Sequence, residues 1–370
     1  MNRLATALVI VLTAASLAAQ RPKPVVDPET SEGLLIQHIQ QETDPVEKLH
    51  FMEQFAAQYP MHSASPWVFD QLQPVYLANK AWDQTMQIGE LRLALEPENL
   101  EAGKIALRAA EAKGDPQLIA KWADRLWRIG TAVAAKGGST GADARGTKDY
   151  AEFCLFSAAQ HDSDLNARLA LLKILEEHGS SSQYFSKLPT EYFNIYRQLG
   201  PSEKALESAE KLVQSNPDNV DAIMFIADTH FKKDSPKERE KVIALTGKVI
   251  DILEKKPRPE SENEADWNVK KAQVLGTAYY MGGVSSNLNG LYPRADIMLR
   301  TALPSIKDPA TEAAVLYHLG IANYKLADKG GPKRSMDALA FMRRCAAIRS
   351  SFQDQAIRNI ETIKAEYNLK

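Results

Sequence analysis

The chain has 370 residues, a length that suggests about two or three domains. Apolar residues make up 44% and charged residues 25%, which is the composition of a folded globular protein and excludes a disordered one. The 45 Lys and Arg residues nearly balance the 47 Asp and Glu residues, giving a net charge of −2. This balance argues against nucleic acid as a partner, because nucleic-acid-binding surfaces are strongly basic.

Residues 1–19 have the pattern of a cleavable signal peptide. Arg3 supplies the positive start, a run from Leu4 to Ala19 is mostly apolar, and small residues precede the expected cleavage after Ala18 or Ala19. The run is shorter than the roughly 18 residues of a membrane-spanning helix, and no second long apolar run follows it. We therefore expect a periplasmic or secreted protein without a membrane span after signal removal. The alternative is an uncleaved signal that anchors the chain in the inner membrane.

Residues 20–30 carry three prolines and predict a flexible leader. The chain contains no Asn-x-Ser/Thr triplet, which favours a bacterial exported protein over a eukaryotic secreted one. No cysteine lies near the cleavage site, so a lipid anchor is not expected. Cys154 and Cys345 each lie among apolar residues at helical spacing, which predicts two free, buried thiols.

The rest of the chain has helical periodicity nearly throughout. Asp44-Pro45, Ser235-Pro236 and Asp308-Pro309 each place a capping side chain before proline at the first helical position. Short connections predict that neighbouring helices are antiparallel. The predicted helices lie near 31–42, 45–59, 65–79, 81–95, 98–113, 116–135, 147–160, 164–178, 182–199, 202–215, 219–233, 236–255, 263–281, 293–306, 310–327, 333–348 and 352–367.

The second half of the chain resembles the tetratricopeptide repeat (TPR) family. Its pattern places Leu-Gly-x2-Tyr on the first helix of a pair and Ala-x3-Phe on the second. Leu275-Gly276-x2-Tyr279 matches the first half of the pattern, and Leu319-Gly320 matches it with Tyr324 one place late. Ala295-x3-Leu299 and Ala338-x3-Met342 are similar to the second half. The resemblance implies an all-α fold, an α-solenoid of antiparallel helix pairs.

The predicted domain organisation has two helical parts. Degenerate helical-hairpin repeats are expected over 31–136, a Gly-rich linker loop over 137–147, and a TPR-like solenoid over 148–370. Two repeats are longer than the usual unit, and the extra residues, Ser285–Gly290 and Ala327–Lys333, are expected to project as loops from one edge of the stack. Whether these loops, within 282–292 and 327–333, are ordered is left open, as is the oligomeric state.

Patterns that carry chemistry are weak. Gly141-x4-Gly146-Thr147-Lys148 has the last two residues of a phosphate-binding loop reversed and follows no predicted strand. The seven histidines are scattered and none has the spacing of a zinc site. The sequence therefore predicts no cofactor, no metal and no catalytic residue.

A row of residues on the first helix of each of three repeats is the candidate partner-binding site. The row is offset by one residue from the row that faces the partner helix, and its spacings of three and four keep each trio on one helical face. An aromatic residue ends each trio, so that the three would form a ladder along a concave groove; ordinary packing between repeats is the alternative. This inner row comprises Met224, Asp228, Phe231, Gln273, Thr277, Tyr280, Tyr317, Ile321 and Tyr324.

The function predicted from this pattern is that of an exported, non-catalytic scaffold that binds a protein or peptide in the cell envelope. A helical-repeat stack offers a long binding face because each unit contacts only its neighbours. The alternative is an all-helical envelope hydrolase or lyase, with carboxylate and tyrosine side chains in the groove acting on a sugar or peptide.

Overall fold

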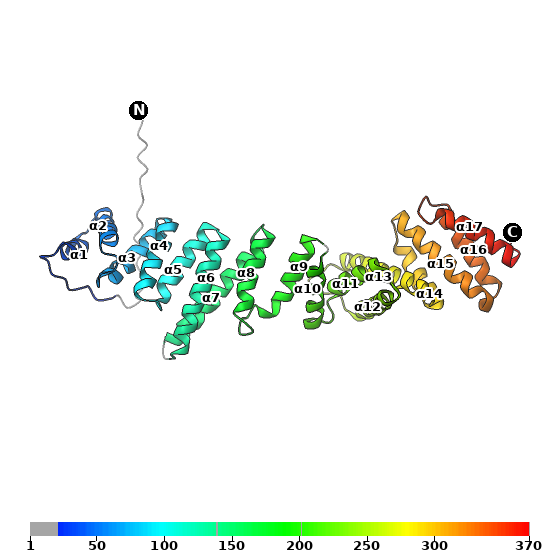
Figure 1. The fold of residues 1–370 in the computed structure, drawn as a ribbon, viewed down its shortest axis with the longest axis horizontal. Coiled ribbons are helices and arrows are strands. Elements are labelled where there is room, and N and C mark those ends of the chain that lie inside the picture. The colour runs from blue at the N-terminus through cyan, green and yellow to red at the C-terminus, as the bar shows by residue number, and fades with distance from the viewer. Residues whose placement is uncertain (1–20, 138–139, 201, 370) are drawn as a thin grey trace, which may run out of the picture. The chain divides into compact units, whose positions relative to one another are not determined.

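The structure, a computed structural model, describes residues 21–137, 140–200 and 202–369. Within these residues every regular element is a helix and no strand occurs, which confirms the predicted all-α class. Within each unit, most helices that follow one another in the sequence pack side by side as antiparallel neighbours (Figure 1). The predicted signal peptide over 1–19 lies outside the described residues.

The chain divides into two compact units, of which the first ends at Leu188. Its helices pack as four successive pairs, α1 with α2, α3 with α4, α5 with α6 and α7 with α8. Their bounds are α1 Ser31–Gln41, α2 Pro45–Gln58, α3 Ser65–Ala78, α4 Trp82–Leu95, α5 Leu100–Lys113, α6 Pro116–Ala135, α7 Thr140–His161, α8 Leu165–Glu177 and a short 3-10 helix, Phe185–Lys187.

The second unit begins at Pro189, one residue inside α9. Pairs form between α11 and α12, α13 and α14, and α15 and α16, and a single helix, α17, packs on α16 at the C-terminal end. The bounds are α9 Leu188–Leu199, α10 Glu203–Ser215, α11 Val220–Lys233, α12 Pro236–Lys255, α13 Glu264–Leu288, α14 Tyr292–Ala302, a 3-10 helix Leu303–Ser305, α15 Pro309–Gly330, α16 Pro332–Ala346 and α17 Gln353–Tyr367.

The three predicted Asp-Pro and Ser-Pro helix starts are confirmed. The Asp44 carboxylate accepts the backbone N–H of Val46 at 2.8 Å at the start of α2. Asp308 accepts the N–H of Thr311 at 2.8 Å, and Ser235 accepts the N–H of Glu238 at 3.3 Å. Each cap satisfies a donor that the first helical turn leaves without a partner.

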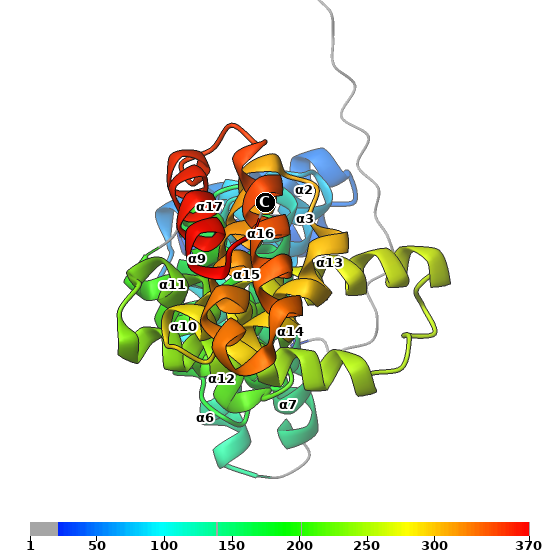
Figure 2. The ribbon, with the colours of Figure 1, turned by 90° about the vertical axis from the view of Figure 1, so that its right-hand side faces the viewer.

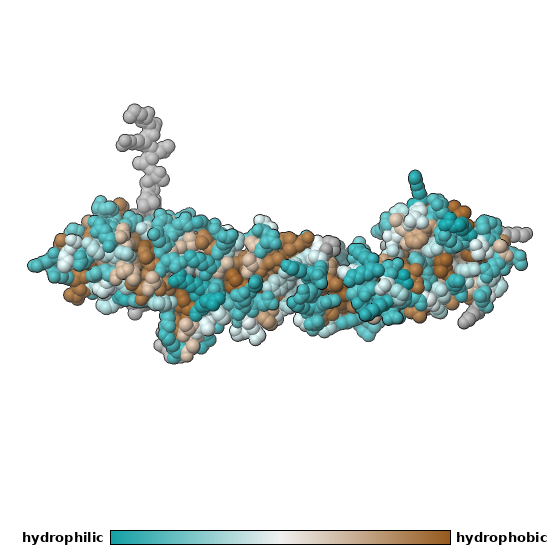
Figure 3. Space-filling view, viewed as in Figure 1, coloured by the Kyte–Doolittle hydropathy of each residue, from teal (hydrophilic) through white to brown (hydrophobic). Residues whose placement is uncertain are grey.

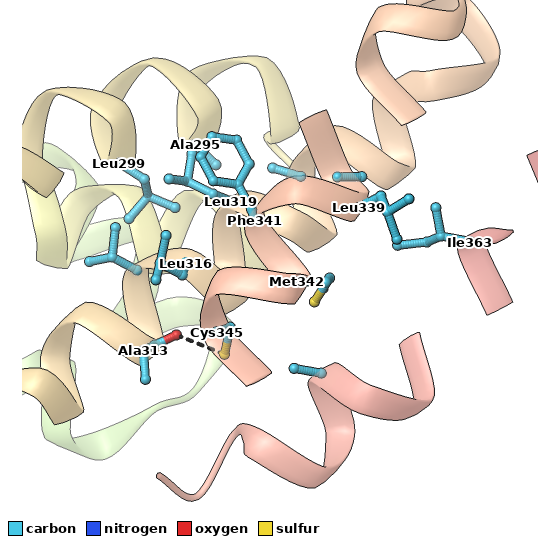
Figure 4. Close-up of a cluster of buried hydrophobic side chains, with 14 of the residues drawn as sticks. Ala295, Leu299, Ala313, Leu316, Leu319, Leu339, Phe341, Met342, Cys345 and Ile363 are labelled. Carbon is cyan, nitrogen blue, oxygen red and sulfur yellow. Dashed lines mark hydrogen bonds between the residues drawn. The ribbon is translucent and has the colours of Figure 1, made fainter. Parts of the chain in front are cut away.

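The C-terminal part of the core of the second unit joins side chains of consecutive helices. Leu299 of α14, Leu319 of α15, Met342 of α16 and Ile363 of α17 are all almost fully buried in one cluster (Figure 4). Gly320 lets α15 and α16 approach closely, since a Cβ there would lie 2.9 Å from Cγ of Met342. The small residue of the Leu-Gly pattern is therefore required by packing.

The structure differs from the predicted Gly-rich linker. Helix α7 begins at Thr140, and α6 and α7 pack against each other along this segment. A Cβ on Gly130 of α6 would lie 3.1 Å from the carbonyl oxygen of Ala144 on α7. Gly130 therefore lets α7 approach α6 closely, and the part of the predicted linker from Thr140 onwards belongs to α7. The boundary between units falls at Leu188 instead of 137–147.

The two predicted loops are also helical in large part. Helix α13 continues to Leu288, and α15 continues to Gly330 before a turn at Gly331. Gly283 in α13 packs against Leu299, and a Cβ at that position would lie 2.7 Å from the leucine side chain. The extra residues lengthen the first helix of each pair because this close packing compensates for the poor helix propensity of glycine.

The longest helix pair of the second unit, α12 with α13, extends beyond its neighbours. The C-terminal end of α12 and the N-terminal half of α13 project together from the stack (Figure 2). The N-terminal half of α13 is accordingly mostly exposed, and Val269 is exposed by 57%. The predicted inner-row residues on α13 therefore lie close to the root of this projection.

The leader has no regular secondary structure over residues 21–27 but is held by specific contacts. Arg21 forms ion pairs with Asp70 and Glu96 at 3.4 and 2.6 Å, and Gln40 donates to the carbonyl oxygen of Pro24 at 3.1 Å. The leader was predicted to be flexible, and the structure instead places it against the first unit.

Candidate functional site

The first helices of successive pairs in the second unit lie next to one another. Helix α11 contacts α13, α13 contacts α15, and α15 contacts α17. Helices α11, α13 and α15 each bury one face against their own partner helix, as Leu316 and Leu319 of α15 show with no exposed surface. The predicted inner row lies on a neighbouring face, which we call the inner face.

The α11 members of the inner row are half-buried. Asp228 forms an exposed ion pair with Lys232 at 2.6 Å, one turn further along the same helix. Met224 and Phe231 pack against the buried cluster around Ala227 and Met281. The carboxylate of Asp228 is thus already compensated by a cation on its own helix.

The α13 members divide into exposed and packed residues. Gln273 and Thr277 are exposed, whereas Tyr280 is half-buried. The rings of Tyr280 and Phe231 meet nearly edge to face, with centroids 5.7 Å apart. Burial, with the nearby Asp308 carboxylate, raises the pKa of Tyr280. The first two aromatics of the predicted ladder are therefore adjacent.

The α15 members pack towards the C-terminal end of the chain. The ring of Tyr317 lies 4.9 Å from that of Phe352, which precedes α17. The ring of Tyr324 lies 6.2 Å from that of Tyr367 at an angle of 84°. The ladder predicted as Phe231, Tyr280 and Tyr324 thus consists of two separate ring pairs, because Tyr324 pairs with an aromatic of α17.

Sequence reasoning missed the α17 side of this face. Tyr324 donates its hydroxyl hydrogen to Glu366 at 2.5 Å, and Tyr367 donates to Asp328 at 2.8 Å. These hydrogen bonds to carboxylates raise the pKa of both tyrosines, that of Tyr367 to about 12. The only signal in the sequence is that Asp328 follows Tyr324 by four residues, one helical turn.

A buried polar network joins α14, α15 and α16 behind the inner face. The Asp296 carboxylate accepts hydrogen bonds from Arg300, Asn323 and Arg334 at 2.5–2.7 Å. Burial raises the pKa of Asp296, but these hydrogen bonds outweigh it, so the pKa lies below its ordinary value of 3.8. Arg300 also bonds to Asp337 at 2.7 Å. The network fixes the relative position of the three helices.

A second buried cluster in the first unit has residue types that occur in catalytic sites. His178 is buried between Glu152 and Asp124, at nitrogen–oxygen distances of 3.7 and 3.5 Å, and its ring stacks on Trp127. Ser182, however, donates to Glu152 at 2.9 Å and not to the histidine. A serine nucleophile requires a hydrogen bond to its general base, so this geometry is not that of a Ser-His-Asp triad. The cluster links α6, α7 and the segment after α8.

The described residues contain no group of three or more His, Cys, Asp or Glu side chains that could hold a metal ion. Two pockets among the described residues lie on the surface of the first unit, with volumes of about 590 and 310 Å³. Their linings are Glu96, Pro97, Glu98, Asn99, Leu100 and Val133 for the larger, and Lys104, Arg108, Asp143, Gly146, Thr147 and Tyr150 for the smaller.

Both cysteines are free and buried, as predicted. The Cys345 thiol contacts the carbonyl oxygen of Ala313 at 3.3 Å (Figure 4), and burial raises its pKa to about 11. Both effects keep it protonated and unreactive. Of the helices that the structure describes, none has the length together with the apolar composition needed to cross a membrane.

Hydrophobic residues on the visible surface of each unit are interspersed with hydrophilic ones (Figure 3). Single exposed apolar residues of this kind are normal on folded proteins. The candidate site rests on the arrangement of the inner face.

Comparison with known proteins gives no family assignment. No family model matches the chain, and no curated protein matches it. Thirty chains of solved structures match, among them the crystal structure of yeast Tom70 at 10% sequence identity. That match covers 93% of this chain and 90% of that chain, with a TM-score of 0.26. At this level of superposition it says nothing about the partners of this chain.

The packing of the helices shows an all-α protein built from stacked helix pairs. Within the described residues, successive antiparallel helix pairs build each unit, which is the arrangement that the TPR resemblance implies. Helical-repeat proteins of this class typically act as scaffolds for protein binding.

Proposed function

We propose that this chain is a non-catalytic scaffold that binds a protein or peptide through the inner face of its second unit. One observation carries the proposal: helix packing leaves part of the inner row accessible. Gln273 and Thr277 are exposed, and the aromatic residues of the row are half-buried. Rigid aromatic side chains supply contact area at low entropic cost, which suits peptide recognition.

The proposed location is the bacterial cell envelope, reached by export. This part rests on the signal-peptide pattern of residues 1–19 alone. A protein that works outside the cytoplasm without disulfides must be stable through packing, and the buried free thiols of Cys154 and Cys345 agree with that requirement.

The proposal is tested by blocking the inner face without removing any packed side chain. The double variant Gln273→Arg/Thr277→Arg places two long charged side chains on exposed positions of α13. We expect it to lose a partner that the wild-type protein retains in affinity purification from its own cells. Its melting temperature should change little, because exposed substitutions cost at most about 0.5 kcal/mol.

A matched control makes the same residue changes on helices that carry no inner-row residue. Gln214 of α10 and Thr301 of α14 are both exposed. The Gln214→Arg/Thr301→Arg variant should keep the partner. If both double variants keep it, or both lose it, the inner face is not the binding surface.

A further inference from the structure

The leader meets the first unit in a cluster of four charged side chains. It runs from the start of α1 back to α3 and α4 (Figure 1). There Arg21 lies between two carboxylates, with Nε 3.4 Å from Asp70 on α3 and Nη2 2.6 Å from Glu96, which follows α4. Arg92 of α4 contacts the same two carboxylates, Asp70 at 2.8 Å and Glu96 at 2.9 Å. Two guanidinium groups therefore share one pair of carboxylates.

Three members of this cluster are built by the helices alone. Helices α3 and α4 pack against each other, and Arg92 is only 1% exposed, so its guanidinium belongs to the fold. Within the part of the chain that the structure describes, its buried Nη1 has no hydrogen-bond partner. The side chains of Asp70 and Glu96 are exposed by 40% and 36%. The two carboxylates are thus held from below by Arg92 and remain open from above.

Charge balance in the cluster requires a second cation. Among the described residues, the cations that form ion pairs with the two carboxylates are Arg21 and Arg92. Burial raises the pKa of Glu96, but hydrogen bonds from Arg92 and Arg21 outweigh it, so the pKa lies below its ordinary value of 4.5. Without Arg21, one buried positive charge would face two negative charges. A further cation between the carboxylates is therefore favoured.

The placement of the two carboxylates suits an arginine better than a lysine. A guanidinium presents its N–H donors in a rigid fork and can bond two carboxylates at once, whereas a lysine has a single ammonium nitrogen. Arg21 uses Nε for Asp70 and Nη2 for Glu96. The site therefore selects for the shape of the side chain as well as for its charge.

Few other contacts attach the leader to the first unit. Gln40 donates to the carbonyl oxygen of Pro24, and Val26 is half-buried against the core, whereas Val25 is fully exposed. Prolines keep such a segment extended before it binds, so that it loses little conformational entropy on docking. The leader thus resembles a bound peptide more than a part of the helical stack.

We propose that Asp70, Glu96 and Arg92 form a binding site for an arginine side chain followed by proline, and that the leader is its resident, displaceable ligand. The ligand class is a proline-rich segment that begins with arginine, and a partner segment of this chemistry would compete with the leader. The site lies in the first unit, so the inference does not rest on the proposed function of the inner face. It gives the scaffold a second binding surface.

The test measures docking of the leader in the whole chain without its predicted signal peptide. Nitroxide labels on Lys23→Cys and Ala132→Cys, both at exposed positions, report a distance distribution by pulsed EPR. Cys154 and Cys345 are buried and should remain unlabelled. A docked leader should give a narrow distribution. Free peptide Arg-Pro-Lys-Pro-Val-Val, the sequence of residues 21–26, should broaden it at about millimolar concentration, because tethering gives the leader an effective concentration of that order.

The variants change the ligand and leave the site intact, because removing the carboxylates would leave the buried charge of Arg92 unpaired. Arg21→Gln should broaden the distribution without added peptide. Arg21→Lys should broaden it in part, since one ammonium cannot bond both carboxylates as a fork does. A peptide that begins with Gln should need about tenfold higher concentration than the Arg peptide. The matched control, Lys113→Gln, breaks an exposed ion pair with Asp83 in the same unit and should keep the narrow distribution.

The outcomes decide between a ligand site and a fixed part of the fold. If Arg21→Gln keeps the narrow distribution, the contacts of Pro24 and Val26 hold the leader and the arginine site is refuted. If the Arg and Gln peptides displace the leader equally, or neither displaces it, the site does not recognise arginine in a separate segment and the inference is wrong. Partner capture by Gln273→Arg/Thr277→Arg tests the inner face separately, so the failure of one proposal leaves the other standing.

Discussion

The buried histidine of α15 predicts a loss of stability at mildly acidic pH. His318 is 7% exposed, and its Nδ1 lies 2.8 Å from Nδ2 of Asn287 on α13. An amide NH2 can only donate, so Nδ1 accepts and the imidazole is neutral. Burial lowers the pKa of His318 from 6.5 to about 4, and the charge of Asp234 opposes this only in part.

The sign and size of the effect follow from this shift. The unfolded chain takes up a proton near pH 6.5, whereas the folded chain takes it up only near pH 4. Stability is therefore fully present above pH 6.5 and is lost as the pH falls towards 4, because the unfolded state binds more protons in this window. At about 1.4 kcal/mol per pKa unit, the loss is about 3 kcal/mol.

The assay must report the second unit alone, since the chain has two units that can unfold separately. Amide hydrogen exchange of α13, α15 and α16, read by mass spectrometry, gives that local free energy of opening. Between pH 7 and about pH 4.5, after correction for the intrinsic exchange rate, the free energy of opening of the wild-type protein should fall.

The variant His318→Gln keeps an acceptor for Asn287 and should largely abolish this dependence on pH. His161→Gln, at an exposed histidine, should behave as the wild type. An equal loss in wild type and His318→Gln would refute the reasoning.

Two further predictions concern packing. Asp296→Asn keeps the shape of the buried network but removes its charge, and should cost about 2–3 kcal/mol at pH 7 in denaturant unfolding. The carboxylate contributes this stability above pH 3.8 and loses it as the pH falls below that value, so the two proteins should converge in acid. Gly320→Val should cost about 1–3 kcal/mol, because its Cβ would meet Met342. Gly146→Ala, where a Cβ would meet nothing within 4 Å, should be neutral or stabilising; equal melting of the two glycine variants would contradict the packing argument.

The helices were predictable because their signals are local. A capping side chain such as Asp308 acts within three residues, and Leu319-Gly320 reflects one contact between neighbouring helices. The length of α13 was not predictable in the same way. Gly282 and Gly283 favour a loop by propensity, and only their contacts with α12 and α14 make a continuous helix the better state.

The candidate site was harder to predict than the helices, because its contacts join residues that are far apart in the sequence. The inner row could be placed on one face of each helix from spacing alone, and Phe231 does meet Tyr280. The partner of Tyr324, in contrast, is Tyr367, which belongs to a helix that matches no repeat pattern. No local periodicity encodes which ring completes a contact between residues so far apart in the chain.

The accessibility of the inner face follows from the geometry of stacking. A first helix in a stack packs against its own partner and against the first helices before and after it, so three directions are covered and a fourth remains open. In α15 the direction of its partner helix takes Leu316 and Leu319, which are fully buried, and the direction of α17 takes the half-buried rings of Tyr317 and Tyr324. In α13 the open direction leaves Gln273 and Thr277 exposed. Packing therefore determines where a partner can bind, while the residues placed on the open side determine what kind of partner binds.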